Sequence, residues 1–215
     1  MRVMIACEFS GTVREAFRVR GHDAISCDLL PSRQPGPHIQ GDIRAVDLRG
    51  YDLLIAHPPC TYLCASGLHW NHRRPGRAAL TEDALHLVRY LLNAPVPAIA
   101  LENPRGCIST RIRHYDQEIQ PYDFGHDASK ATCLWLKSLP PLHPTCRIAA
   151  RIVDGRRRWA NQTDSGQNRL TPSPERAQLR SITYQGIAAA MADQWGTATE
   201  RHDIPVALSL FDYAT

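Results

Sequence analysis

The sequence contains no apolar run that approaches the roughly 20 residues a helix needs to cross a bilayer. Its opening stretch, MRVMIACEFSG, has one basic residue and a very short apolar segment, which is not the pattern of a secretory signal. Internal repeats, low-complexity tracts and an obvious interdomain linker are also missing. With 215 residues, 43% of them hydrophobic, we expect a soluble intracellular protein of one domain, or one domain with a small appendage.

Cysteine pairs of the CxxC type are absent as well. The seven cysteines are an odd number and are scattered along the chain. In an intracellular protein of this size the pattern argues against a disulfide framework. It predicts that most of the cysteines are small buried apolar residues.

Charge of one sign is not in large excess, because 25 Lys and Arg stand against 21 Asp and Glu. The distribution says more than the total. Residues 146–162, CRIAARIVDGRRRWANQ, hold five arginines and one acid, Asp154. Such a patch predicts a polyanion partner, although a solvated face is the alternative. Asp154-Gly155 is typical of a two-residue type I′ turn, so we expect a hairpin here.

Strand and helix patterns alternate in the first half of the chain. Apolar runs predict strands at 2–7, 22–28, 51–57 and 96–103. A helix is expected over 11–21, with Val13, Phe17 and Val19 as its apolar face and Gly21 as its stop, and another over 81–94 with Thr81 as N-cap. Residues 31–41 read as a Pro- and Gly-rich loop. Later patterns predict a strand at 130–138 and a helix over 183–195. The alternation predicts an α/β fold with a doubly wound, Rossmann-like parallel sheet.

Four chemically distinctive stretches follow the predicted strands: CEFSG, CDLLP, HPPC and ENP. In parallel sheets of this kind, ligands bind at the carboxyl ends of the strands. The sequence therefore predicts a functional site at this edge of the sheet.

Cys60 follows two prolines at the end of a buried strand. Proline fixes φ and cannot donate a ladder hydrogen bond, so the strand must stop and the thiol is held in a defined direction. A nucleophilic cysteine also needs its thiolate form, which a helical segment starting near Leu63 would favour. The alternative is a buried structural cysteine after a turn.

Glu102 ends the next strand, in AIALENP. A carboxylate after four apolar residues is expected to be partly desolvated, which raises its pKa and suits it for proton donation or for a hydrogen bond to a base edge. A salt-bridged rim residue is the alternative.

The series EFSG, CDLLP, GDI, PPC and ENP, within residues 2–107, resembles the motif series of the DNA cytosine-5 methyltransferases. The resemblance implies an S-adenosylmethionine-dependent methyltransferase fold that acts on DNA. Cys60 would add to C6 of a flipped cytosine, and Glu102, with Asn103 beside it, would contact the N3/N4 edge and protonate N3. C5 would then take the methyl group. The base must leave the stack to reach the thiol, at a cost of a few kcal/mol.

The same resemblance implies the residues that hold the cofactor. Phe9 would lie beside its adenine or methionine portion, and the segment 10–12 would wrap the amino acid end. Asp28 would accept from the ribose hydroxyls, and Asp42 from the adenine amine. The full implied set is Phe9, Ser10, Gly11, Thr12, Asp28, Leu29, Asp42, Ile43 and Pro58.

The chain departs from the family pattern in several places. Its first loop has one glycine, Thr61 replaces the usual glutamine after Pro-Cys, and no clear Gln-x-Arg-x-Arg stretch is present. It is also short, which implies a reduced target-recognition region and a short or loose recognition sequence. The expected division is a catalytic and cofactor-binding core at 1–107, a reduced recognition region at 108–167, a return to the core at 168–196 and a tail at 197–215. The residues expected to contact DNA are Arg156, Arg157, Arg158, Trp159 and Arg169, with Trp159 either stacking on a base or packing underneath.

Other functions remain open at this stage. His57, Cys60 and Cys64 lie within eight residues, and a zinc-dependent, deaminase-like site is one alternative, although the cysteine spacing and the missing H-x-E fit it poorly. An exocyclic amino-methyltransferase is another, but HPPC departs from its usual motif. A degenerate fold that only binds DNA is the third. The resemblance favours a small phage- or prophage-type enzyme in the cytoplasm of a bacterial or phage-infected cell. It implies no metal, no membrane and no obligate protein partner.

Overall fold

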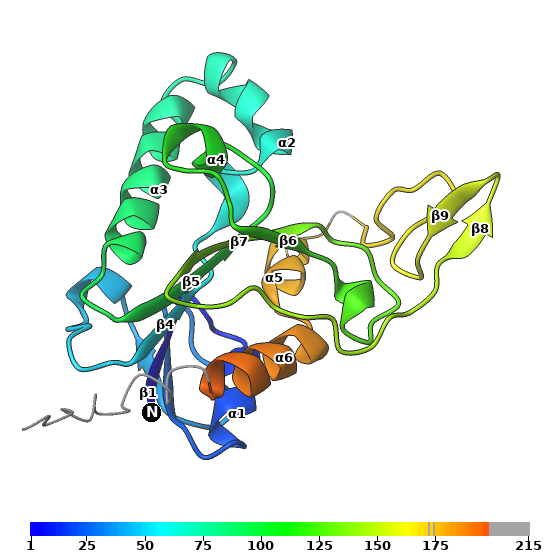
Figure 1. The fold of residues 1–215 in the computed structure, drawn as a ribbon. Coiled ribbons are helices and arrows are strands. Elements are labelled where there is room, and N and C mark those ends of the chain that lie inside the picture. The colour runs from blue at the N-terminus through cyan, green and yellow to red at the C-terminus, as the bar shows by residue number, and fades with distance from the viewer. Residues whose placement is uncertain (172, 174, 198–215) are drawn as a thin grey trace, which may run out of the picture.

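A computed structural model describes residues 1–171, 173 and 175–197 of the chain. Its centre is a seven-stranded sheet of order β3-β2-β1-β4-β5-β7-β6 (Figure 1). The strands are β1 (Arg2–Ala6), β2 (Asp23–Asp28), β3 (His38–Gln40), β4 (Leu53–Ala56), β5 (Ala98–Asn103), β6 (Gln117–Ile119) and β7 (Thr132–Lys137). The first five are parallel, and β7 runs antiparallel to both β5 and β6. The fold is the predicted α/β, Rossmann-like one.

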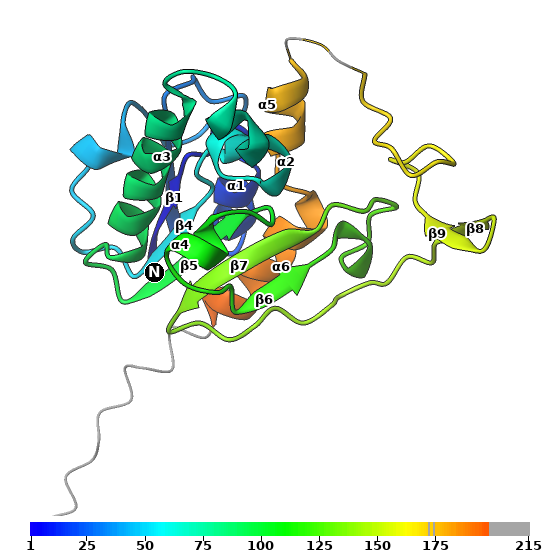
Figure 2. The ribbon, with the colours of Figure 1, turned by 90° about the horizontal axis from the view of Figure 1, so that it is seen from above.

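Helices cover both faces of the sheet, as expected for a doubly wound fold (Figures 1 and 2). The helices are α1 (Thr12–Arg18), α2 (Ala65–Leu68), α3 (Arg77–Leu92), α4 (Ile108–Arg111), α5 (Arg176–Ser181) and α6 (Gln185–Gly196). Helices α1 and α6 pack together on one face, where Phe17 and Trp195 are fully buried. Helix α3 lies on the other face, where Leu85 and Val88 are buried. None of the helices in the described ranges is long and apolar enough to cross a membrane.

The parallel register brings four strand ends to one line. Ala6 of β1 pairs with Cys27 of β2 and with Ala56 of β4, and Ala56 pairs with Leu101 of β5. All four side chains are buried on the α3 face. The residues that follow them therefore form a row along the carboxyl edge of the sheet, in the order Asp28, Cys7, His57 and Glu102. The site predicted from the sequence lies along this row.

Two expectations about the helices were wrong. The helix expected over 81–94 begins at Arg77, after Gly76 in a left-handed conformation (φ 77°). Thr81 is not an N-cap but is buried within the helix, where its hydroxyl hydrogen-bonds to the Tyr62 carbonyl (3.1 Å). Val19 is 83% exposed because α1 ends one residue before it, so it is not part of the buried face.

Short elements also went unpredicted. The 31–41 segment contains β3, a three-residue edge strand, and β6, α4 and α5 had no clear sequence pattern. Single turns of 3-10 helix occur at η1 (Ile43–Ala45), η2 (Cys60–Tyr62), η3 (His69–His72) and η4 (Pro121–Asp123). Elements of three to six residues are too short to show a hydrophobic period, and tertiary contacts decide them.

The basic segment forms the predicted hairpin, with strands β8 (Arg151–Val153) and β9 (Arg156–Arg158). Asp154 (φ 49°) and Gly155 (φ 70°) both have the positive φ that a type I′ turn requires. The hairpin projects away from the body of the molecule (Figures 1 and 2). The proposed boundaries between core and recognition region stay predictions, and residues 198–215 of the predicted tail lie outside the described residues.

Candidate active site

The segment after β4 carries Cys60 away from the sheet edge. Pro59 is extended, and the 3-10 turn η2 begins at Cys60, whose side chain is exposed. Asn103, the last residue of β5, donates its side-chain amide to the Pro58 carbonyl (2.7 Å). The two prolines and this buried hydrogen bond fix the segment next to Glu102.

The far end of this segment is fixed to the residues after β5. Two backbone hydrogen bonds join them: Ala65 N–H to the Arg105 carbonyl (3.0 Å) and Cys107 N–H to the Leu63 carbonyl (2.9 Å). The approach requires glycine, because a Cβ on Gly106 would lie 1.9 Å from the Leu63 carbonyl oxygen. The Cys60 segment and the Glu-Asn-Pro segment are therefore held together as one unit.

The thiols of Cys60 and Cys64 are near enough to shift each other's pKa in opposite directions. The hydrogen bond from Cys60, together with those from the Ser66 hydroxyl and the Gly67 N–H, lowers the pKa of Cys64 to about 5 despite its burial. Donation to Cys64 and the negative charge of Glu102 raise the pKa of Cys60. The expected effect of a helix near Leu63 thus falls on Cys64, which directly precedes α2, rather than on Cys60.

Glu102 is paired with His57. Their Oε2 and Nδ1 atoms are 3.0 Å apart, and the side chains are 14% and 6% exposed. Burial raises the pKa of Glu102, but the hydrogen bond from His57, the charge of Lys130 and the Thr132 hydroxyl outweigh burial and hold it below its usual value. The expectation of a raised pKa was therefore wrong, because the sequence did not reveal the partners that stabilise the carboxylate.

Lys130 is a cation of the site that sequence reasoning missed. Its charge helps to lower the pKa of Glu102 and opposes the raised pKa of Cys60, so the ammonium acts on both groups. Its Nζ donates to the Arg180 carbonyl (2.8 Å). No motif marks Lys130, and only the antiparallel pairing of β7 with β5 brings it to the site.

Cys7 lies among the acids predicted to hold the cofactor. It follows β1 in a left-handed conformation (φ 58°). Burial and the charges of Asp28 and Asp42 raise its pKa to about 12. Asp28 accepts the Leu30 N–H (2.9 Å), whereas Asp42 accepts both the backbone and the guanidinium of Arg44, so its pKa is lowered. Both acids are therefore near Cys7, at the carboxyl ends of β1 and β2.

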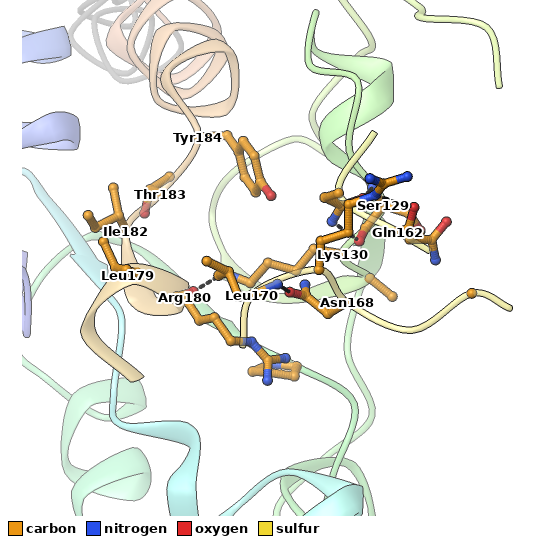
Figure 3. A pocket seen from close by; sticks show the side chains of 15 residues that line it. Ser129, Lys130, Gln162, Asn168, Leu170, Leu179, Arg180, Ile182, Thr183 and Tyr184 are labelled. Carbon is orange, nitrogen blue, oxygen red and sulfur yellow. Dashed lines mark hydrogen bonds between the residues drawn. The ribbon is translucent and has the colours of Figure 1, made fainter. Parts of the chain in front are cut away.

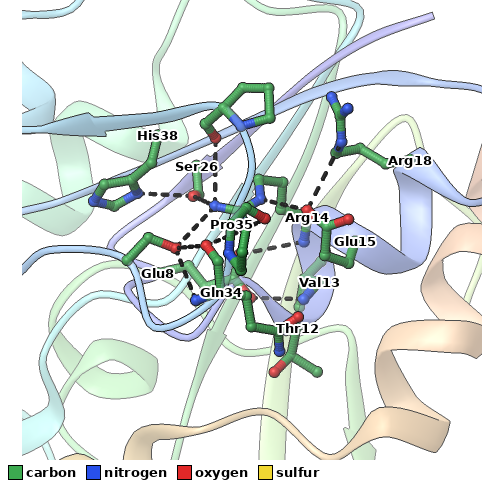
Figure 4. A network of polar contacts seen from close by, with 12 residues as sticks. Glu8, Thr12, Val13, Arg14, Glu15, Arg18, Ser26, Gln34, Pro35 and His38 are labelled. Carbon is green, nitrogen blue, oxygen red and sulfur yellow. Dashed lines mark hydrogen bonds and ion pairs between the residues drawn. The ribbon is translucent and has the colours of Figure 1, made fainter.

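The first loop is closed by Glu8, a second residue that sequence reasoning missed. Its buried carboxylate accepts the Val13 N–H (2.6 Å), the Arg14 N–H (3.2 Å) and the Ser10 hydroxyl (3.1 Å) (Figure 4). These are donors at the start of α1, so Glu8 caps the helix from outside it. Gly11 precedes α1 with φ 73°, which favours glycine.

Arg14 is fully buried and holds the loop between β2 and β3. Its guanidinium donates to the Ser26 hydroxyl (3.0 Å) and to the carbonyls of Gln34 (3.0 Å) and Pro35 (2.9 Å) (Figure 4). The loop in turn places Arg33 over the buried Phe9 ring, 5.1 Å from its centroid.

The other predicted cofactor residues differ in exposure. Ile43 is buried in the α3-side core, whereas Leu29 is 70% exposed. Thr12 donates its N–H to the Ser10 hydroxyl (3.2 Å). Their predicted roles stay predictions.

A cavity of about 700 Å³ opens beside the segment that follows Glu102 (Figure 3). Its lining includes Pro104, Lys130 and Arg180 from the core side and Asn161 and Arg169 from the loop after β9. In the described part of the chain no carboxylate lines it. The cavity is therefore positively charged and rich in amide groups.

The predicted DNA-contacting residues fall into two groups. Arg156 and Arg157 are exposed on the hairpin. Arg158 donates to the Asp164 carbonyl (2.8 Å), and Trp159 is buried against the Tyr122 ring with centroids 4.3 Å apart. Of the two positions expected for Trp159, the structure has the packed one.

The structure also tests the expectation that most of the cysteines are buried. All seven cysteines are free, and only Cys27, Cys107 and Cys133 are buried, so the expectation that most are buried was wrong.

Within residues 1–171, 173 and 175–197, no three His, Cys, Asp or Glu side chains are grouped to hold a metal ion. The ring of His57 is directed to Glu102, while the Cys64 thiol contacts the Ser66 hydroxyl (3.3 Å).

No protein-family profile matches the chain, and no curated protein matches it. Among solved structures, a DNA modification methyltransferase encoded within an E. coli prophage matches 63% of this chain and 46% of its own, at 15% identity and a TM-score of 0.42. The S. pombe Dnmt2 methyltransferase matches 63% of this chain and 48% of its own, at 16% identity and a TM-score of 0.42. The matched part is thus less than half of either structure.

Proposed function

We propose that this chain methylates C5 of cytosine in DNA, with S-adenosylmethionine as methyl donor. The observation that carries the proposal is the joining of the Cys60 segment to the Glu102 segment at the carboxyl edge of the sheet. The thiol and the carboxylate interact electrostatically there, and the charge of Lys130 acts on both. A thiol suits this chemistry because it adds reversibly to an electron-poor ring and then leaves.

In the proposed reaction, the Cys60 sulfur bonds to C6 of a flipped cytosine and transfers its proton to the Cys64 thiolate. N3 takes up a proton from solvent as the C6–S bond forms, so the ring stays neutral, and the Glu102 carboxylate accepts hydrogen bonds from N4 and from protonated N3. C5 becomes nucleophilic in consequence. After methylation, the C5 and N3 protons pass to solvent and the sulfur leaves C6 as a thiolate that takes its proton back from Cys64, which restores the aromatic ring. The lowered pKa of Glu102 suits this role of acceptor.

The residues at the β1 and β2 ends fit the cofactor by their chemistry. Asp28 has one hydrogen bond from Leu30, and its second carboxylate oxygen suits the ribose hydroxyls. Asp42, with Ile43 behind it, would face the adenine, and Phe9 with the 10–12 loop would border the methionine end. When bound, the cofactor supplies the electrophilic methyl group, and Pro58 would border it on the Cys60 side.

DNA would lie along the cavity and the hairpin. Lys130, Arg169 and Arg180 provide positive charge without acids in the cavity lining. The exposed Arg156 and Arg157 extend that charge outward. Phosphate contacts of this kind position a duplex without reading its sequence, which suits a short recognition region.

The test is to incubate the protein with labelled S-adenosylmethionine and duplex DNA, digest the DNA and identify the modified base. We expect 5-methylcytosine. N4-methylcytosine or N6-methyladenine would reject the mechanism, and DNA binding without transfer would favour a degenerate fold. Cys60→Ala should abolish transfer, whereas Cys64→Ala, the matched control, should slow it and keep the same product.

A further inference from the structure

We infer that His57 is a positioning residue for Glu102: it fixes the rotation of the carboxylate and keeps it ionised when the base arrives. The inference rests on the proposed function and adds a residue to it. From the sequence alone, the one role expected for His57 is that of a zinc ligand in the deaminase-like alternative.

The contact between His57 and Glu102 determines which ring nitrogen of His57 carries a hydrogen. A carboxylate has no proton to donate, so the 3.0 Å contact requires a hydrogen on His57 Nδ1. The backbone N–H of His57 is bonded to the Ala6 carbonyl (2.9 Å), and Pro58 follows at once, so the ring has little freedom. His57 therefore sits in the strand-end row between Cys7 and Glu102 and acts as a fixed donor.

The other ring nitrogen marks the pair as more than a structural contact. Nε2 is buried and has no hydrogen-bond partner in the described part of the chain, although the side chain is 6% exposed. Native proteins rarely leave a buried polar atom unpaired, and those that do so often carry a functional group there. Nε2 is therefore open to a hydrogen-bond partner that arrives with the substrates.

The surroundings of Glu102 explain why a donor is needed. Besides His57 from the end of β4, the carboxylate is faced by Lys130 and Cys133 from the β7 side and by Cys60 from η2. The Lys130 ammonium also donates a hydrogen bond to the Arg180 carbonyl. Without His57, burial would dominate, the carboxyl would take up a proton at a higher pH, and its orientation would no longer be fixed.

Two variants separate positioning from packing. His57→Asn places an amide donor near the position of Nδ1, whereas His57→Leu keeps the bulk without a donor. We expect Asn to retain kcat within about tenfold. We expect Leu to lower kcat at least about 100-fold with KM for DNA within about threefold, and to move the acid limb of its pH profile to higher pH. Equal loss in both variants with an unchanged acid limb would overturn the inference.

A measurement without turnover separates this inference from the proposed function. ¹³C NMR titration of the Glu102 carboxyl should give a higher pKa in His57→Leu than in the wild type or in His57→Asn, and ¹⁵N NMR of the wild type should show the Nδ1–H tautomer. An unchanged Glu102 pKa would reject the positioning role even in an active enzyme. A shifted pKa in a protein that makes no 5-methylcytosine would instead reject the proposed function alone.

Discussion

At the scale of single residues, the pKa of each acidic group in this site is set by its interactions with neighbouring groups. Cys60 is the more exposed thiol, yet it is Cys64 that has the lowered pKa, because Cys60, Ser66 and Gly67 all donate hydrogen bonds to it. Glu102 is similarly governed by His57 and Lys130. The donors to Cys64 are its neighbours in the sequence, whereas the partners of Glu102 come from distant segments.

The thiol pair gives a prediction about chemical reactivity. Alkylation rates follow the thiolate fraction, so iodoacetamide at pH 7 should modify Cys64 before Cys60, and the rate at Cys64 should rise with a midpoint near its pKa of about 5. Peptide mass spectrometry over time measures both rates. Cys60→Ala removes the strongest donor and should move the midpoint upward by more than Ser66→Ala does. Faster modification of Cys60 in the wild type would show that the thiolate lies there instead.

At the scale of elements, the site depends on the contact between the segment after β4 and the segment after β5. Gly106 is the residue that permits it, since a Cβ there would collide with the Leu63 backbone. Backbone cannot move away as a flexible side chain can, so any substitution must displace one of the two segments.

Gly106→Ala should therefore separate Cys60 from Glu102 and lower kcat at least about tenfold, because sub-ångström misplacement of reacting groups is costly. Gly41→Ala is the matched control, since a Cβ on Gly41 meets nothing within 4 Å. Methyl transfer measured in both variants, with circular dichroism to verify folding, tests this. Full activity in Gly106→Ala would mean that the contact does not position the thiol.

The hairpin β8-β9 gives a prediction about salt dependence. Replacing Arg156 and Arg157 together by Gln should weaken DNA binding and reduce the slope of log K against log salt by about 2, because each phosphate contact contributes about 1. The control is Arg49→Gln, since Arg49 is equally exposed but precedes β4 at the opposite edge of the sheet. Fluorescence anisotropy with a labelled duplex gives both slopes. Equal slopes in the wild type and the double variant would show that the hairpin faces solvent only.

At the scale of the whole molecule, the sequence predicts the central strands of the sheet well and the short edge strands poorly. The buried strands β1, β4 and β5 each contain a continuous apolar run, and the alternation of strands and helices predicts that they are parallel, so a row of site residues at their carboxyl ends was foreseeable. The short strands β3 and β6 carry no such signal. Helix α3 was placed four residues late because Thr81 looks like a cap but is buried by contacts from the η2 and η3 turns.

The candidate site was predictable to the extent that its chemistry is local. Pro-Pro-Cys and Glu-Asn mark their own strand ends, and Asp154-Gly155 marks its turn. Glu8 caps α1 through residues that follow it closely, but no motif marks it. His57 and Lys130 could not be assigned their roles, because both act on Glu102, which is distant from each of them in the sequence. Their partners are set by sheet register, which a single sequence does not reveal.

The most direct measurement is a covalent trap with a duplex that carries 5-fluorocytosine. After methyl transfer the fluorine at C5 cannot be removed as a proton is, so the sulfur should stay bonded to C6. With S-adenosylmethionine present, we expect a complex that survives denaturing gel electrophoresis and a crosslinked peptide that maps to Cys60, still formed by Cys64→Ala but not by Cys60→Ala. Mapping of the adduct to Cys64, or binding of the duplex and the cofactor without any adduct, would remove Cys60 from the centre of the reaction.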